Sequence, residues 1–239
     1  MMVKKKSLLV AALLALFNAA FSQNEDHVLV KTGQDAGKVI PFQDQYVYKD
    51  FREGQLYYPN SDRSETMKLN YNLLAENVVF INSNGDTLMM NRGENIFKYV
   101  RIGGDLYHHD LIEGYFLLVT REPKVQLAVK RSWKVLRGEP LVNNGYSTTS
   151  SSVGTYTGIR SSDTNRFIVH EDLVYHKAED YFLITYDGRL FKANKAGFTK
   201  LFQDARSEIR EYLRANAIDF EKQDDLKKLL DYCIKLSKA

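Results

Sequence analysis

The stretch 78–90, VVFINSNGDTLMM, decides the fold class because it has the pattern of a β-hairpin. Two apolar runs flank a polar turn in which Gly85 can adopt the positive φ angle that a tight hairpin requires. The same plan recurs at 97–109, FKYVRIGGDLYHH, and at 181–193, YFLITYDGRLFKA. Three hairpins in one region predict an antiparallel β-meander between about residues 28 and 193.

A longer strand is predicted at 125–137, VQLAVKRSWKVLR. Alternate residues place five apolar side chains on one face: Val125, Leu127, Val129, Trp133 and Val135. Arg131 interrupts this face, which predicts a bulge or a bend nearby. At about 3.3 Å per residue, the strand is long enough to curl around a core.

The apolar period changes from two to 3.6 after Gly197. The first helical stripe consists of Phe198, Leu201, Phe202, Ala205, Ile209, Tyr212 and Leu213. A second helix in 218–236 has the stripe Leu226, Leu229, Leu230 and Cys233. The fold class is therefore α+β, with a curved antiparallel β-meander, sandwich-like or open-barrel-like, in 23–197. A C-terminal helix pair in 198–239 packs against it.

The first 22 residues have the layout of a cleaved signal peptide. Three lysines precede an apolar run from Leu8 to Ala20, and the small residues Ala20 and Ser22 predict cleavage before Gln23. The apolar run, about 14 residues, is shorter than the roughly 20 that a spanning helix needs. We expect a periplasmic or secreted protein that is not an integral membrane protein.

Composition narrows the functional classes further. Removal of the three lysines of the signal peptide brings the formal net charge from +3 to zero, so no basic excess points to nucleic acid. The single cysteine, Cys233, excludes an intramolecular disulfide and is expected to be a buried structural thiol. Residues 143–166 are dominated by Ser, Thr, Gly and Asn, which is typical of a flexible loop.

The histidines are the first candidates for chemistry. The stretch 103–114, GGDLYHHDLIEG, places His108 and His109 between Asp105 and Asp110. Adjacent side chains of a strand point to opposite faces, so at most one of these histidines can enter a given site. His170 and His176, six residues apart, diverge on a helix and lie about 20 Å apart in a strand. We expect no metal and no cofactor.

Catalytic signatures are absent from the sequence, which has no nucleophile elbow, phosphate-binding loop or zinc-protease motif. No catalytic residue is therefore assigned. Carboxylates that converge from separate strands, as in a glycosidase, remain open. Tyr57 and Tyr58, if exposed, could stack on a sugar; packing across strands is the alternative.

Three stretches resemble a group of uncharacterised exported proteins of the Bacteroidetes type: FSQ at 21–23, MKLNYNLLAENVVFINSNGDTLMM at 67–90, and the helical segment 200–233. The resemblance implies a fold and an exported location, and no activity. Exported proteins of that lineage are glycosylated at Asp-Ser/Thr followed by a small or apolar residue. Asp86-Thr87-Leu88 fits this form, which makes Thr87 a candidate for O-glycosylation.

These features favour an exported envelope protein that works as a non-enzymatic binding or assembly module. Its expected partner is an envelope protein or a glycan, and not nucleic acid. The alternative is a hydrolase whose carboxylates converge from separate strands. A third class is a structural subunit without a small ligand.

Overall fold

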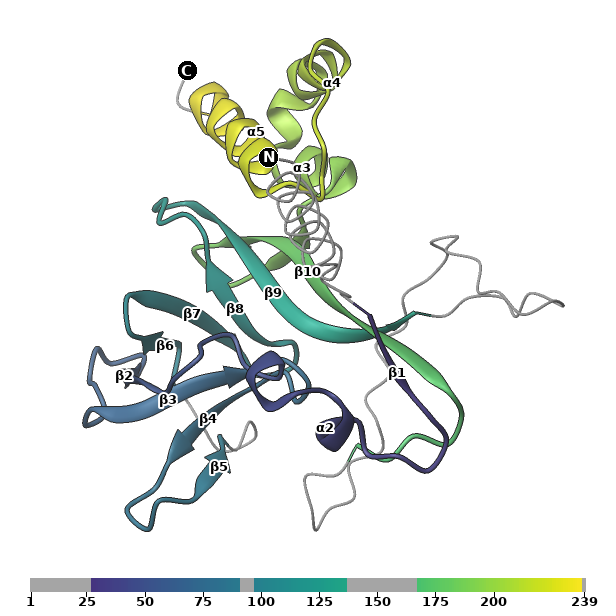
Figure 1. Cartoon of the computed structure of the whole chain (residues 1–239). Coiled ribbons are helices and arrows are strands. Elements are labelled where there is room, and N and C mark those ends of the chain that lie inside the picture. Colours follow the sequence, from purple (N-terminus) through teal and green to yellow (C-terminus); the bar gives the residue numbers. More distant parts are fainter. Residues whose placement is uncertain (1–26, 91–96, 137–166, 238–239) are drawn as a thin grey trace, which may run out of the picture.

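The computed structural model describes residues 27–90, 97–136 and 167–237 (Figure 1). The expected signal peptide, 1–22, and the Ser/Thr-rich loop, 143–166, lie outside the described residues. The strands are β1 His27–Val30, β2 Arg52–Tyr57, β3 Met67–Asn72, β4 Asn77–Ile81, β5 Thr87–Met89, β6 Tyr99–Ile102, β7 Asp105–Asp110, β8 Gly114–Leu118, β9 Val125–Leu136, β10 Leu173–Thr185 and β11 Leu190–Lys192. The α-helices are α2 Ala36–Val39, α3 Lys195–Leu201, α4 Arg206–Ala215 and α5 Gln223–Leu236.

All eleven described strands belong to one open, curved antiparallel sheet, as predicted. Its order is β1-β10-β9-β8-β7-β6-β2-β3-β4-β5, and β11 pairs with β10. The three predicted hairpins are confirmed as β4–β5, β6–β7 and β10–β11. Gly85, Gly103 and Gly188 in their turns have φ angles of 85°, 59° and 86°, the left-handed conformation that glycine adopts without strain.

The longest pairing in the sheet joins β9 and β10, and we call these two strands the β9–β10 ribbon. Its pairing runs without interruption from Val125 opposite Thr185 to Leu136 opposite Val174, so of the bulge or bend predicted near Arg131, a bulge is not found on this side of β9. Arg131 lies opposite Glu179, and its Nε donates to Glu179 Oε1 over 2.8 Å. This cross-strand ion pair accommodates the charge in the regular ladder. The strand still curves strongly along its length (Figure 1).

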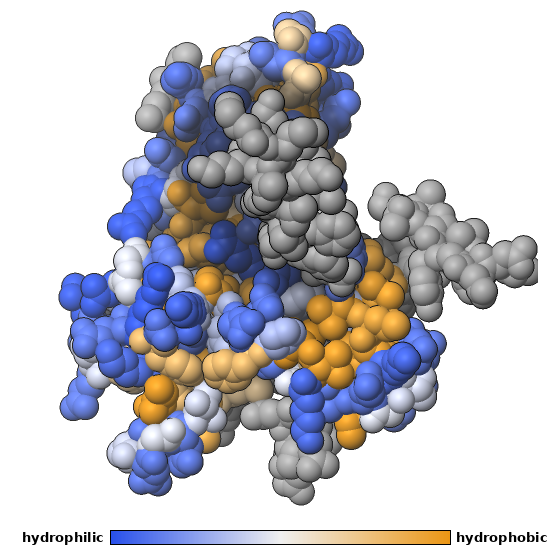
Figure 2. All heavy atoms as spheres, viewed as in Figure 1, coloured by the Kyte–Doolittle hydropathy of each residue, from blue (hydrophilic) through white to orange (hydrophobic). Residues whose placement is uncertain are grey.

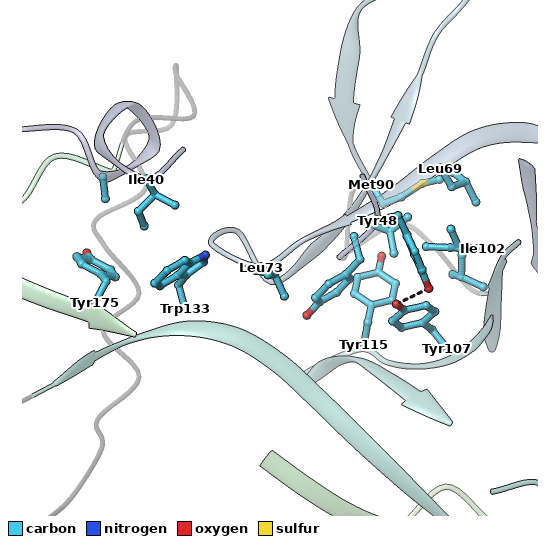
Figure 3. Close-up of a cluster of buried hydrophobic side chains, with 14 of the residues drawn as sticks. Ile40, Tyr48, Leu69, Leu73, Met90, Ile102, Tyr107, Tyr115, Trp133 and Tyr175 are labelled. Carbon is cyan, nitrogen blue, oxygen red and sulfur yellow. Dashed lines mark hydrogen bonds between the residues drawn. The ribbon is translucent and has the colours of Figure 1, made fainter. Parts of the chain in front are cut away.

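One face of this ribbon contributes to two separate cores. Beyond Arg131, Trp133 and Val135 belong to the sheet core (Figure 3). Its other large members include Ile40, Tyr48, Leu69, Tyr71, Ile102, Tyr107, Tyr115 and Tyr175. Before Arg131, the same face belongs to the helix core, which consists of Val125, Leu127, Val129, Tyr181, Leu183, Ala193, Phe198, Ile209, Leu226, Leu229, Leu230 and Cys233.

The C-terminal helices pack against β9 and β10 through the helix core, but the first predicted helix is broken. It ends at Leu201, and α4 begins at Arg206 after a single 3-10 turn, Gln203–Ala205. Phe202 at the break leaves the helical conformation, with φ −107° and ψ 56°. Ile209 is fully buried, whereas Leu201, Phe202 and Leu213 are only partly buried against the helix core.

The sheet curls until the turn after β3 meets β9. The Leu73 carbonyl oxygen accepts a hydrogen bond from the Trp133 backbone N–H, 3.1 Å away. In the same turn, Glu76 forms a 2.8 Å ion pair with Lys130. Val129 is the last β9 residue that pairs with β8, and this turn lies beside the part of β9 that follows it. The turn therefore places the carboxylate of Glu76 on the outer face of the β9–β10 ribbon.

Hydrophilic side chains cover most of the face drawn in Figure 2. Apolar side chains gather there over β1 and the neighbouring end of the β9–β10 ribbon. Leu29 in β1 and Ile168 before β10 are 46% and 42% exposed. No helix in the described part of the chain has the length and the apolar character needed to cross a bilayer.

Candidate functional site

Among the described strands, two pair with the side of β10 that faces away from β9, and a gap separates them. β1 pairs with Leu173–His176, and β11 pairs with Phe182–Ile184. The Ala193 backbone N–H donates to the Tyr181 carbonyl oxygen over 2.8 Å, which closes one end of the gap. Along the four residues 177–180, no described strand pairs with the side of β10 that faces away from β9.

Two hollows meet at this gap between the described strands. The larger, about 510 Å³, is bounded by the gap in β10, the residues after β11 and the connection between α4 and α5. The smaller, about 300 Å³, lies on the outer face of the β9–β10 ribbon. Lys134, Asp180 and Lys192 line both hollows. Because these three residues line both hollows, the hollows are neighbours, and we call the two together the edge groove.

The three charged residues that line both hollows are two lysines and one aspartate. Lys134 Nζ donates a short hydrogen bond to Asp180 Oδ2, and its side chain is 12% exposed. Lys192 Nζ lies 3.7 Å from the other carboxylate oxygen of Asp180, and its side chain is 63% exposed. Two lysines therefore face one carboxylate, and the ammonium group of Lys192 remains accessible to a ligand.

Polar groups from the turn after β3, from the turn after β7 and from β9 also line the smaller hollow. Lys130 pairs with Glu76 over 2.8 Å, with 17% and 15% of their side chains exposed, and its Nζ also donates to the Glu113 carbonyl oxygen over 3.0 Å. Ser132 is buried between Lys130 and Lys134 on the same face of β9. Phe182 and Leu190 supply the apolar part of the lining.

The opposite wall of the edge groove is aromatic. Tyr181 is buried, and Phe220 from the connection between α4 and α5 is partly buried. The Tyr181 hydroxyl donates to Glu179 Oε2 over 2.5 Å, and Glu179 Oε1 accepts from Arg131. Burial raises the pKa of Tyr181, and so does its bond to Glu179, so its hydroxyl stays protonated and holds the carboxylate in place.

His176 lines the edge groove beside the end of β1. Its ring stacks on that of His27 with 5.9 Å between the centroids. Burial lowers the pKa of His176, and the neighbouring His27 and Lys134 lower it further. Its Nε2 atom is buried and makes no hydrogen bond to any described residue.

The two histidines of the stretch 103–114 lie on opposite faces of β7, as predicted, and both are buried. The ring of His108 meets Tyr99 edge-on at 5.6 Å, and burial lowers the pKa of His108 to about 4. His109 stacks on Phe97 at 4.4 Å and lies 4.7 Å from the ring of Tyr115. These contacts make the two histidines part of the packing.

The two aspartates of the same stretch also have structural roles. Asp105 Oδ2 accepts from the Tyr48 hydroxyl over 2.7 Å, and that hydroxyl lies 2.9 Å from the hydroxyl of Tyr107 (Figure 3). Burial raises the pKa values of both tyrosines, to about 12 for Tyr107. Asp110 Oδ1 accepts two backbone N–H groups in the turn that follows β7.

The remaining histidines and the cysteine are not brought together. His170 is exposed before β10, apart from the stacked pair of His176 and His27. Cys233 is fully buried in the helix core, and burial raises the pKa of its thiol to about 12. Among the described residues, no group of three or more His, Cys, Asp or Glu side chains could hold a metal ion.

The two surface predictions have different outcomes. Tyr57 and Tyr58 are partly buried rather than exposed. The guanidinium of Arg63 lies 5.1 Å from the Tyr57 ring centroid, and Tyr58 packs on the sheet core, so neither is an open platform for a sugar. Thr87 is exposed at the start of β5, and its glycosylation stays a prediction.

The edge groove also bears on the hydrolase alternative. Glu76, Glu113 and Asp180 reach the smaller hollow from separate elements, as that alternative requires. Glu76 and Asp180 each form an ion pair with a lysine, and no ion pair is found for Glu113 among the described residues. The hydrolase therefore remains the second candidate function for this groove.

No residue of this groove was predicted to be functional from the sequence. The one signal was the polar face of 125–137, on which Lys130, Ser132 and Lys134 alternate with apolar residues. Comparison with known proteins adds no assignment: no family model, no curated protein and no solved structure matches the chain.

Proposed function

We propose that this chain is an exported, non-enzymatic binding module that holds a polar ligand in the edge groove. The observation that carries the proposal is the pair of neighbouring hollows whose linings share Lys134, Asp180 and Lys192. Charged groups line one side of the groove, and an aromatic wall lines the other. A few placed polar groups beside apolar surface are the usual composition of a ligand site.

The rigidity of the walls supports binding. Lys134 and Asp180 belong to the uninterrupted β9–β10 ribbon, so their positions are fixed before a ligand arrives. A preformed site loses less conformational entropy on binding than a flexible one. The sequence pattern of residues 1–22 supports export, and an envelope protein or a glycan is the expected partner.

The proposal is tested by amide chemical shifts of the chain from Gln23 to Ala239. Soluble envelope glycan fragments and short peptides are titrated separately. Binding should shift the amides of Ala178 and Asn194, which line the larger hollow. Lys192→Glu should weaken it, whereas Lys38→Glu, at an exposed position in α2 outside the groove, should not.

Two results would count against the module. If no ligand of either class shifts the groove amides, the proposal is wrong. If a ligand is cleaved in the same sample, the hydrolase alternative takes its place. Loss of that cleavage in Asp180→Asn would then assign the reaction to this groove.

A further inference from the structure

The smaller hollow of the edge groove indicates the chemical class of the ligand. We infer, on the basis of the proposed function, that this hollow binds a short free peptide and recognises both of its terminal charges. The carboxylate of Glu113 receives the amino terminus, and the ammonium group of Lys192 receives the carboxyl terminus. An apolar side chain of the peptide packs on Phe182 and Leu190.

The formal charges that line the smaller hollow sum to zero. All of its lining residues belong to the described part of the chain, and they include three lysines and three acidic residues. Two close ion pairs use four of these charges: Lys130 with Glu76, and Lys134 with Asp180. The other two charges have opposite signs, on Glu113 and Lys192. The lining therefore fits a ligand that carries one charge of each sign rather than a net anion or cation.

Glu113 presents its carboxylate from a turn whose backbone is held at two points. The Glu113 backbone N–H donates to Asp110 Oδ1 over 2.8 Å, and the Glu113 carbonyl oxygen accepts from Lys130 Nζ over 3.0 Å. Glu113 itself is exposed, and it forms no ion pair with any described residue. Because its backbone is already fixed, this carboxylate can bind an ammonium group with a small loss of conformational entropy.

Lys192 supplies the opposite charge from β11. Its Nζ atom lies 3.7 Å from Asp180 Oδ1, whereas Lys134 Nζ makes a shorter bond to the other oxygen of the same carboxylate. Asp180 is therefore shared by two ammonium groups, and that of Lys192, with 63% of its side chain exposed, is held less closely. A peptide carboxylate can bind Lys192 without separating Lys134 from Asp180.

The apolar part of the lining lies beside the Lys192 ammonium group. Phe182 and Leu190 pack on a small buried cluster that consists of Phe116, Leu118, Ala128 and Ile184. The rings of Phe182 and Phe116 meet edge-on at 5.0 Å, and Lys192 Nζ lies 5.5 Å from the centroid of the Phe182 ring. This arrangement favours a peptide whose last residue is apolar, because that side chain lies next to the terminal carboxylate.

The positions of the two charges limit the length of the peptide. Lys130 and Asp180 are directly opposite each other across β9 and β10. Lys130 Nζ contacts the backbone of Glu113, and Asp180 faces Lys192, so the two charges lie on either side of this cross-strand pair. Opposite Cα atoms are about 5 Å apart, and the side chains extend the separation to on the order of 10 Å. At about 3.3–3.6 Å per residue, an extended tripeptide spans this distance.

The test measures the binding of the tripeptide Ala-Ala-Leu to the chain from Gln23 to Ala239 by isothermal titration calorimetry. Acetylation of the peptide removes its positive charge, and amidation removes its negative charge. Each change should weaken binding by about three- to tenfold, as expected for one partly exposed charged contact. Glu113→Gln should bind the free and acetylated peptides equally, and Lys192→Met should bind the free and amidated peptides equally, because each variant lacks the group that recognises that terminus.

Two matched controls locate the contact in the smaller hollow. Glu221→Gln removes an exposed carboxylate that lines only the larger hollow, and Lys38→Gln removes an exposed ammonium group outside the edge groove. Both variants should keep the full response to acetylation and amidation. Ala-Ala-Ser should bind more weakly than Ala-Ala-Leu, because it lacks the side chain that packs on Phe182 and Leu190.

Several outcomes would overturn the inference. If the free, acetylated and amidated peptides bind equally, the terminal charges are not recognised. If Glu113→Gln and Lys192→Met respond to acetylation and amidation as the parent chain does, the peptide binds elsewhere. If glycan fragments shift the amides of the edge groove and the peptide does not bind, the ligand class is wrong and the proposed binding function stands. If neither class binds, the inference and the proposed function both fail.

Discussion

Truncation of Phe198 tests whether the helices and the sheet unfold as one unit. Phe198 is fully buried in the helix core, where β9, β10 and the C-terminal helices meet. Replacing a buried phenylalanine with alanine typically costs about 3–5 kcal/mol, a large part of the roughly 5–15 kcal/mol that stabilises a domain. In a chain of this size, the melting temperature should fall by about 6–20 °C.

The assay can separate the two cores because the chain has one tryptophan. Trp133 lies in the sheet core, so its fluorescence monitors the sheet, while circular dichroism at 222 nm monitors the helices. In Phe198→Ala, both signals should shift together, because one uninterrupted ribbon carries both cores. The matched control is Phe42→Ala at a site 66% exposed, which should cost about 1 kcal/mol or less.

The result that would refute this reasoning is a loss of helical signal with an unchanged fluorescence midpoint. The helices would then fold separately from the sheet, and the β9–β10 ribbon would not couple the two cores. Equal melting of the two variants would instead show that Phe198 contributes no more than an exposed phenylalanine.

Three further predictions concern the sheet, its response to pH and the processing of the chain. Gly54→Ala should destabilise the protein, because a Cβ there would lie 2.2 Å from the carbonyl oxygen of Arg101. Gly104→Ala, where nothing lies within 4 Å, should have little effect, and equal melting temperatures would contradict this close approach. Burial lowers the pKa of His108 from 6.5 to about 4, so the unfolded chain takes up the proton first as the pH falls. The free energy of unfolding should therefore decrease from about pH 6.5 to pH 4, and denaturant titrations should show a smaller decrease in His108→Phe. The intact mass of the exported chain should correspond to an N-terminus at Gln23, and a mass that retains the three lysines would show that the signal peptide is not removed.

Local sequence signals predicted most elements of the sheet. A hairpin depends on a glycine at the turn and on apolar residues at a period of two, and both are visible in 78–90, 97–109 and 181–193. The opposite orientations of His108 and His109 follow from strand geometry alone. The helical period of 198–236 likewise required no tertiary information, although the break at Phe202 was not predicted, because the stripe continues through it.

The sequence by itself determined the fold class, because alternation of apolar residues and turn chemistry act over a few neighbouring residues. Only the tertiary structure decided which strands lie beside one another, that one face of β9 contributes to two cores, and that a gap in the described pairing separates β1 from β11 along β10. Lys134, Asp180 and Lys192 meet because three strands are in register, and no local pattern specifies the register between distant segments. The edge groove is therefore a consequence of long-range pairing and unequal strand lengths, to which a single sequence gives no direct signal.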